Sequence, residues 1–146
     1  MTINWGFICG ALILSVTALG SGIGINIAGQ AAIGAWKKCF LNNKPAPMIL
    51  LSFVGNPVTQ VFYAYILMDN LMAAAAENPD KMLIYMVFSL VGTAALVTTA
   101  IIQGKIAAYA VVSICEARKG FAHYMAVMGI AETVALFTMV FTVASL

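Results

Sequence analysis

Four long stretches of the chain are almost entirely apolar, and most of the charged residues fall in the short segments that separate them. A helix needs about 20 apolar residues to cross the hydrocarbon core of a bilayer. Each stretch is at least that long. The pattern therefore predicts an all-α membrane protein whose four membrane-spanning helices cover residues 7–35, 47–69, 82–115 and 122–145.

The composition agrees with this pattern. Hydrophobic residues make up 63% of the chain and charged residues 8%, whereas a soluble domain has about 45–50% and 25%. Little sequence remains outside the four spans, so the composition excludes a soluble catalytic domain. The start, "MTINWGF", lacks the basic segment of a cleavable signal peptide, and we expect the first span to stay in the mature protein.

The loop charges predict an orientation. The middle connection, "MDNLMAAAAENPDK", is acidic, whereas the first and third connections are flanked by basic residues: Lys37, Lys38, Lys44, Arg118 and Lys119. Connections rich in lysine and arginine face the cytoplasm. Both termini are therefore expected outside.

The chain also shows a weak internal repeat. "INIAGQAAIGA" in the first span aligns with "GKIAAYAVVSI" in the third at an offset of 79, and "PVTQ" in the second span aligns with "IAET" in the fourth at an offset of 73. This pattern predicts two fused helical hairpins, residues 1–76 and 77–146. The second alignment places Glu132 opposite Thr59, so one carboxylate serves both hairpins.

Small residues form a stripe along the first span. Gly20, Gly24, Ala28 and Ala32 recur every four residues, a spacing that lets helix backbones approach closely in a membrane. An intramolecular contact within a four-helix bundle is one interpretation of this stripe. The cysteines, which have no metal-like spacing, are interpreted as packing residues, and His123 as a side chain at the membrane interface.

One acidic residue stands in the middle of an apolar span, in "VMGIAETVALF". A charge at the bilayer centre costs roughly 2.5–3.5 kcal/mol on insertion scales, so Glu132 needs partners. Thr59 in the second span and Gln103 in the third lie, like Glu132, 10–12 residues from the predicted cytoplasmic ends of their spans. This is about 15–18 Å for the rise of an α-helix, near the midplane.

The second span carries further polar residues beside this level. Asn56, Thr59, Gln60 and Tyr63 share one helical face. Pro57 lies within the same turn, where it cannot donate an N–H and should bend or loosen the helix, leaving backbone oxygens available.

Two interpretations of these polar residues stay open. Carboxylate, hydroxyl, amide and carbonyl oxygens on three helices could coordinate a hard cation such as Na⁺. Alternatively, they could hydrogen-bond a protonated Glu132 and one another, as buried polar groups in lipid must; a proton would need Glu132 alone. Lys105 does not share a face with Gln103, so we expect it to face water or the lumen of a ring rather than to pair with Glu132.

Several of these segments together resemble a known family. "GSGIGINIAGQAAIGA", "NPVTQVFY", "QGKIAA" and "IAETVALF" resemble the rotor-ring proteolipid of rotary ATPases, in particular the four-helix K (c-type) subunit of bacterial V-type sodium-translocating ATPases. The resemblance covers essentially the whole chain.

The resemblance implies roles for individual residues. The ion would be held by Glu132 together with side-chain oxygens and one backbone carbonyl, and Tyr63 would close the site by hydrogen-bonding the glutamate. The remaining ligands implied are Thr59, Gln60, Gln103 and the backbone carbonyl of Asn56. The family usually has an apolar residue at position 56, so Asn56 is a departure whose amide could add a ligand or bind water.

The resemblance also implies an assembly. Identical copies would form a closed rotor ring in the plasma membrane, surrounded by lipid, turning against a membrane stator subunit and attached on the cytoplasmic side to central-stalk subunits, with no nucleic-acid partner. Such a chain performs no ATP chemistry itself and carries Na⁺, or H⁺, as the ring turns. A small multidrug cation antiporter is a more distant alternative, since those chains are shorter and carry their acid in the first span; a purely structural four-span protein leaves the polar residues unexplained.

Overall fold

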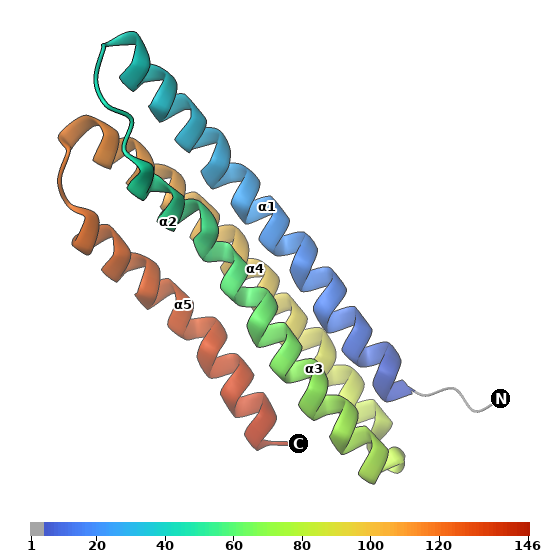
Figure 1. The fold of residues 1–146 in the computed structure, drawn as a ribbon. Coiled ribbons are helices and arrows are strands. Elements are labelled where there is room, and N and C mark those ends of the chain that lie inside the picture. The colour runs from blue at the N-terminus through green and yellow to red at the C-terminus, as the bar shows by residue number, and fades with distance from the viewer. Residues whose placement is uncertain (1–4) are drawn as a thin grey trace.

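The structure, a computed structural model, describes residues 5–146, and its regular structure within that range is entirely helical. Four helical segments lie side by side in an elongated bundle (Figure 1). In chain order the elements are α1 (Trp5–Leu41), η1 (Met48–Leu50), α2 (Leu51–Gly55), η2 (Asn56–Val58), α3 (Thr59–Glu77), η3 (Pro79–Lys81), α4 (Met82–Ala117) and α5 (Phe121–Ala144).

Each of the four segments is long and apolar enough to cross a membrane. The second is built from η1, α2, η2 and α3 in succession. Large apolar side chains such as Leu19, Ile33 and Phe62 are exposed on the outside of the bundle, and a broad exposed apolar surface is typical of a protein that meets lipid. The chain is therefore a multi-pass helical membrane protein, as the hydrophobic pattern predicted.

The prediction of a long middle connection is wrong. The second helix does not end near residue 69 but continues to Glu77, so that only Asn78 separates α3 from η3. The segment "NLMAAAAE" within the expected loop is rich in alanine, leucine, methionine and glutamate, the residues of highest helix propensity. Its one acidic residue, Glu77, therefore lies exposed at the end of α3.

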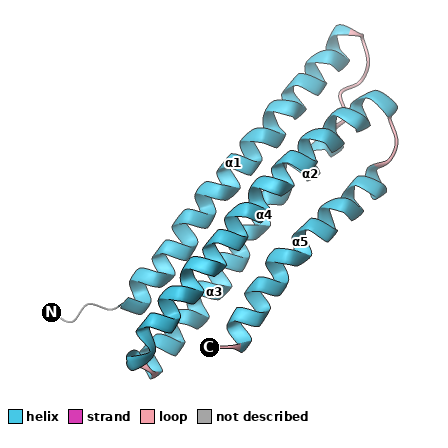
Figure 2. Ribbon diagram, turned by 180° about the vertical axis from the view of Figure 1, so that it is seen from behind, coloured by secondary structure: helices cyan, strands magenta, loops and turns pink. Residues whose placement is uncertain are grey.

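The connections alternate between the two ends of the bundle, as Figure 1 and the reverse view in Figure 2 show. The two basic loops share one end, called here the basic end, where Arg118 Nη1 donates to the Pro45 carbonyl (2.8 Å) and Lys38 pairs with Glu116 (2.7 Å). The α3–α4 turn, the start of α1 and the C-terminus lie at the other end. Gly120 in the second basic loop has a φ of +95°, a conformation that glycine adopts without strain.

The small-residue stripe packs within the chain, against α4. A Cβ built on Gly104 would lie 2.4 Å from the Gly24 carbonyl oxygen, and one built on Gly20 would lie 2.9 Å from Val97 Cα. The α1 and α4 backbones therefore touch, as the spacing of small residues predicted. The two helices run parallel, and the hydrogen bonds between them join residues 76 to 80 positions apart, close to the repeat offset of 79. The two hairpin units stay a prediction.

The same pair of helices positions two of the cysteines. Cys39 on α1 and Cys115 on α4 are buried at the basic end with their sulfur atoms 2.7 Å apart, and Cys9 is buried near the opposite end. All three therefore occupy positions in the core, in agreement with their interpretation as packing residues.

Pro57 loosens the second helix, as predicted. The backbone is 3-10 helical over Asn56–Val58, where the Asn56 N–H donates to the Phe53 carbonyl and the Thr59 N–H donates to the Asn56 carbonyl. Proline has no N–H, so Pro57 cannot donate to the Phe53 carbonyl as it would in an α-helix. The Asn56 N–H donates to that carbonyl instead, in a tighter 3-10 turn. The 3-10 turn begins at Asn56 and ends directly before Thr59, so it lies among the polar residues of the second span.

Candidate functional site

A polar layer divides the core of the bundle. One buried apolar cluster, toward the basic end, includes Ala28, Phe53, Ala107 and Met128; the other, toward the termini, includes Ile13, Ala64, Leu96 and Ala135. Polar residues of all four segments fall between the two clusters along the chain: Thr17 and Ser21 on α1, Thr59 and Gln60 on α3, Thr99 and Gln103 on α4, and Glu132 on α5. Thr59, Gln103 and Glu132 thus share one level of the bundle, and their depth in a membrane stays a prediction.

Two glutamine side chains meet at the centre of this layer. Gln60 Nε2 on α3 donates to Gln103 Oε1 on α4 at 3.0 Å, and both side chains are fully buried. Gln60 Oε1 and Gln103 Nε2 have no hydrogen-bond partner. Because a buried polar atom without a partner is costly, both amides are expected to have further partners.

A second contact brings oxygen atoms together at the start of α3. Thr59 Oγ1 donates to the backbone carbonyl of Asn56 at 3.0 Å and lies 3.5 Å from Gln60 Nε2. Asn56 Nδ2 is buried without a partner. The 3-10 turn at Pro57 positions this contact, because it holds the Asn56 carbonyl next to the first turn of α3.

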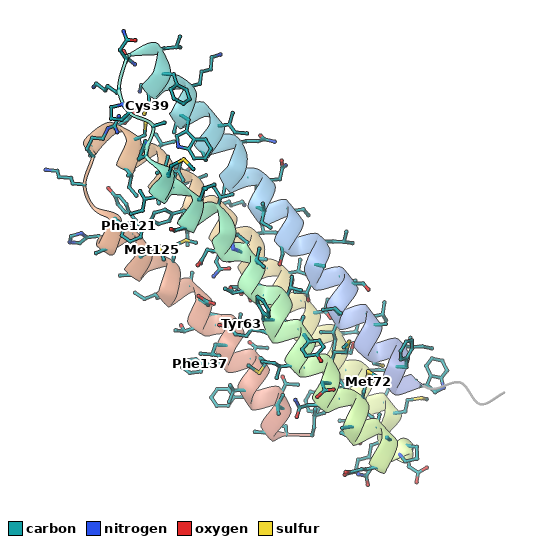
Figure 3. The ribbon with its side chains drawn as sticks, in the orientation of Figure 1. Cys39, Tyr63, Met72, Phe121, Met125 and Phe137 are labelled. Carbon is teal, nitrogen blue, oxygen red and sulfur yellow. The ribbon has the colours of Figure 1, made fainter. Side chains whose placement is uncertain are left out.

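The glutamate makes its contact one turn further along α3. Tyr63 O–H donates to Glu132 Oε1 at 2.8 Å, joining α3 to α5. Figure 3 shows Tyr63 between these two helices, near the middle of the bundle. A hydroxyl that donates to a carboxylate stabilises its negative charge.

The structure therefore arranges the predicted residues in two neighbouring groups along α3. Thr59, Gln60 and Gln103 form the first, and Tyr63 with Glu132 forms the second. Within residues 5–146 no direct hydrogen bond joins the two groups. Residues three or four apart on a helix are neighbours, about 5–6 Å between Cβ atoms, so Tyr63 lies beside both Thr59 and Gln60.

A groove runs beside the glutamate. It has a volume of about 420 Å³, separates α4 from α5, and is lined by small and apolar residues that include Ala95, Thr98, Ala131 and Val134. Ala131 precedes Glu132 in the chain, and the Glu132 residue is only partly buried. The carboxylate thus faces α3 through Tyr63 and is not fully enclosed by the bundle.

The donor set suits a hard, singly charged cation. Gln60 Oε1 is a fully buried acceptor with no donor facing it, and the Thr59 hydroxyl and the Asn56 carbonyl lie close by. These are the oxygen types that hard cations prefer. Glu132 is the one carboxylate in the polar layer, and the described residues hold no cluster of three His, Cys, Asp or Glu side chains. A single negative charge balances a single positive one.

Lys105 stands apart from this site. It is exposed on α4, and in the part of the chain that the structure describes the ion pair is the one between Lys38 and Glu116 at the basic end. Glu132 therefore has no lysine counter-ion, in agreement with the helical-face argument from the sequence. Whether Lys105 faces a ring lumen stays a prediction.

Sequence reasoning missed the α1 side of the layer. Thr17 and Ser21 are buried, with exposed fractions of 0% and 2%, and neither hydroxyl has a partner. Their spacing of four residues, on the same side of the helix as Gly24, was the available signal. This spacing alone does not indicate a site, because serine and threonine side chains in a membrane helix commonly hydrogen-bond to the backbone of their own helix.

Fold and site together define a multi-pass helical membrane protein whose single mid-bundle carboxylate adjoins a buried layer of neutral oxygen donors. Comparison with protein-family models, curated protein sequences and solved structures finds no match to the chain. The family resemblance therefore rests on the sequence segments quoted above.

Proposed function

We propose that the chain is a rotor-ring subunit of a V-type ATPase, which carries Na⁺ across the membrane by reversible binding at Glu132. The observation that carries the proposal is the polar layer, in which the carboxylate held by Tyr63 adjoins Thr59 and the partnerless, fully buried Gln60 Oε1. Gln103 and the Asn56 carbonyl complete the proposed ligand set.

The oxygen donors explain how such a subunit would pass through lipid. A Glu132 that has bound Na⁺ is neutral overall, whereas an empty, ionised Glu132 costs several kcal/mol in hydrocarbon, on the order of 2.5–3.5 kcal/mol by insertion scales. Only loaded sites would then rotate past the lipid, and empty sites would stay next to a polar stator surface. The partial burial of Glu132 supports this, because an ion can leave a partly exposed carboxylate more easily than a fully buried one.

The proposal also assigns partners. Copies of the chain would form a closed ring with α1 and α4 on its inner side, and α3 and α5 on its outer side, facing the stator. The touching backbones of α1 and α4 at Gly24 and Gly104 support a rigid inner pair. The basic end, tied together by Arg118 and the Lys38–Glu116 ion pair, would attach the central stalk on the cytoplasmic side.

Chemical modification tests the proposal. A carbodiimide reacts with a protonated carboxyl group, so Na⁺ bound at Glu132 should protect the purified ring from modification. Binding needs an ionised carboxylate, and metal binding of this kind is favoured as pH rises. The Na⁺ concentration that halves the rate should therefore fall when the pH is raised by one unit, and K⁺ at equal ionic strength should protect far less.

Two variants serve as controls. Glu132→Gln should show no modification at this position with or without Na⁺, and Thr59→Ala should raise the Na⁺ concentration needed for protection. Protection that depends on pH alone, equal in Na⁺ and K⁺, would favour the same rotor subunit carrying H⁺. A purified particle with the mass of a dimer rather than of a ring would refute the rotor assignment and favour a small cation antiporter.

A further inference from the structure

Three of the partnerless buried atoms come from three different helices of the polar layer. They are Ser21 Oγ on α1, Gln60 Oε1 on α3 and Gln103 Nε2 on α4, and the three residues have exposed fractions of 2%, 0% and 0%. Neither the family resemblance nor the proposed function gives Ser21 a role.

The contacts of neighbouring glycines show that Ser21 faces α3. A Cβ on Gly10 would meet Met68 and Met72 of α3, and Ser21 lies about three helical turns further along α1, on the same face. A Cβ on Gly24 would lie 2.9 Å from Pro57. Ser21 is one turn back from Gly24, and Gln60 is one turn on from Pro57 in the antiparallel segment, so Ser21 and Gln60 are level.

The two glutamine side chains reach this level from opposite directions. The Cα–Cβ bond of a helical residue tilts toward the N-terminus of its helix. Gln60 therefore leans toward the basic end and Gln103 toward the opposite end, and they meet in the hydrogen bond of 3.0 Å. The level of Gln103 is set by its neighbour on α4, because Gly104 touches Gly24. Gly24 lies one helical turn from Ser21.

The chemistry of the three atoms is complementary. Gln103 Nε2 can only donate, Gln60 Oε1 can only accept, and the Ser21 hydroxyl can do both. No direct hydrogen bond joins Ser21 to either amide in the described residues. Buried waters in proteins typically make about three hydrogen bonds to polar groups that otherwise lack partners.

We propose that Ser21, Gln60 and Gln103 form a binding site for one buried water molecule, and that Ser21 is a positioning residue for the Gln60 amide. The water accepts hydrogen bonds from Gln103 Nε2 and the Ser21 hydroxyl and donates one to Gln60 Oε1. This donor keeps the amide from turning over, so that Gln60 Nε2 stays bonded to Gln103 Oε1 and Gln60 Oε1 stays an acceptor beside the ion site. A carbonyl oxygen has two lone pairs, and the second stays free for the cation.

The first test is stability, which does not depend on ion transport. Ser21→Ala is compared with Ser89→Ala, which removes an equally buried hydroxyl (3% exposed) that donates to the Cys9 carbonyl at 3.0 Å, far from the layer. If a water joins Ser21 to the amides, Ser21→Ala lowers the Tm of the Na⁺-free ring at least as much as Ser89→Ala does. If the Ser21 hydroxyl has no partner, its removal leaves the Tm unchanged or raises it, and the proposal is refuted.

The second test is ion affinity, and it rests on the proposed function. Ser21→Ala should raise the Na⁺ concentration that half-protects Glu132 from the carbodiimide about tenfold, equivalent to ~1.4 kcal/mol, whereas Ser89→Ala should not change it. Ser21→Thr keeps a hydroxyl and should restore protection. Protection by Na⁺ that is the same in Ser21→Ala and the unmodified chain would refute the positioning role while leaving the proposed function intact.

The two tests separate the two proposals. If the unmodified ring shows no protection by Na⁺ while Ser21→Ala still lowers the Tm, the proposed function fails and the water site stands. A density map of the ring that resolves buried waters should show one within hydrogen-bonding distance of Ser21, Gln60 and Gln103. Such a map with no peak there would overturn the water site even if Ser21→Ala failed to fold.

Discussion

The contact between α1 and α4 can be tested with a single methyl group. Gly104→Ala would place a Cβ 2.4 Å from the Gly24 carbonyl oxygen, 2.5 Å from Gly24 Cα and 2.7 Å from Gly24 C. All three atoms are backbone atoms in the middle of long helices, so none can move aside by changing a rotamer. The two helices would have to separate by several tenths of an ångström or more.

The expected cost follows from this geometry. Overpacking of a core costs about 1–3 kcal/mol, and at this contact we expect the upper part of that range because rigid backbone takes up the strain. Alanine recovers about 1 kcal/mol through its higher helix propensity. The net destabilisation of about 2 kcal/mol should lower the Tm by roughly 4–8 °C in a chain of this size.

Two other glycines provide matched controls for the same substitution. A Cβ on Gly22 meets nothing within 4 Å, so Gly22→Ala should leave the Tm unchanged or raise it. A Cβ on Gly92 would lie 2.6 Å from Leu67 Cδ2, the far end of a flexible side chain, so Gly92→Ala should fall between the other two. Thermal unfolding of the purified protein measures all three. Equal Tm values for Gly22→Ala and Gly104→Ala would refute the close contact of α1 with α4.

Two further predictions concern the Tyr63–Glu132 hydrogen bond and the orientation of the chain in the membrane. Tyr63→Phe removes the 2.8 Å hydrogen bond to Glu132; hydrogen bonds to charged groups contribute about 1.5–3 kcal/mol, and partial exposure favours the lower value, so Na⁺ should leave the site about tenfold faster. The rate of carbodiimide modification after dilution out of Na⁺ measures this, and an unchanged rate would mean that Tyr63 does not retain the ion. Cysteines introduced by Asn42→Cys and Asn78→Cys should react with an impermeant thiol reagent from the cytoplasmic and the outer side respectively, provided that the three native cysteines are first replaced; labelling in the reverse pattern would invert the predicted topology.

Local features of the sequence account for much of the fold. The four apolar stretches predicted four helices because hydrophobic length is a strong constraint in a bilayer. Pro57 predicted the loosened turn because its missing N–H acts on its own helix. The middle connection is mostly helical because the helix propensity of Ala73–Ala76 outweighs the acidic residues on either side.

The candidate site was predictable only in part. A lone glutamate in an apolar span marks a site by itself, and helical periodicity placed Thr59, Gln60 and Tyr63 on one face. Periodicity on one helix cannot say which residue of another helix it meets. The pairing of Gln60 with Gln103, and of Tyr63 with Glu132, therefore needed the structure.

The sequence by itself determined that this chain is helical and suited to a membrane, and that one carboxylate lies near the middle of an apolar helix. These properties follow from composition and from the fixed rise and period of a helix. The tertiary structure decided that α1 packs against α4 through Gly24 and Gly104, and that the Ser21 hydroxyl is buried without a direct partner. Such facts depend on how closely separate helices approach and how they are rotated about their axes, which the side chains of all four segments set together.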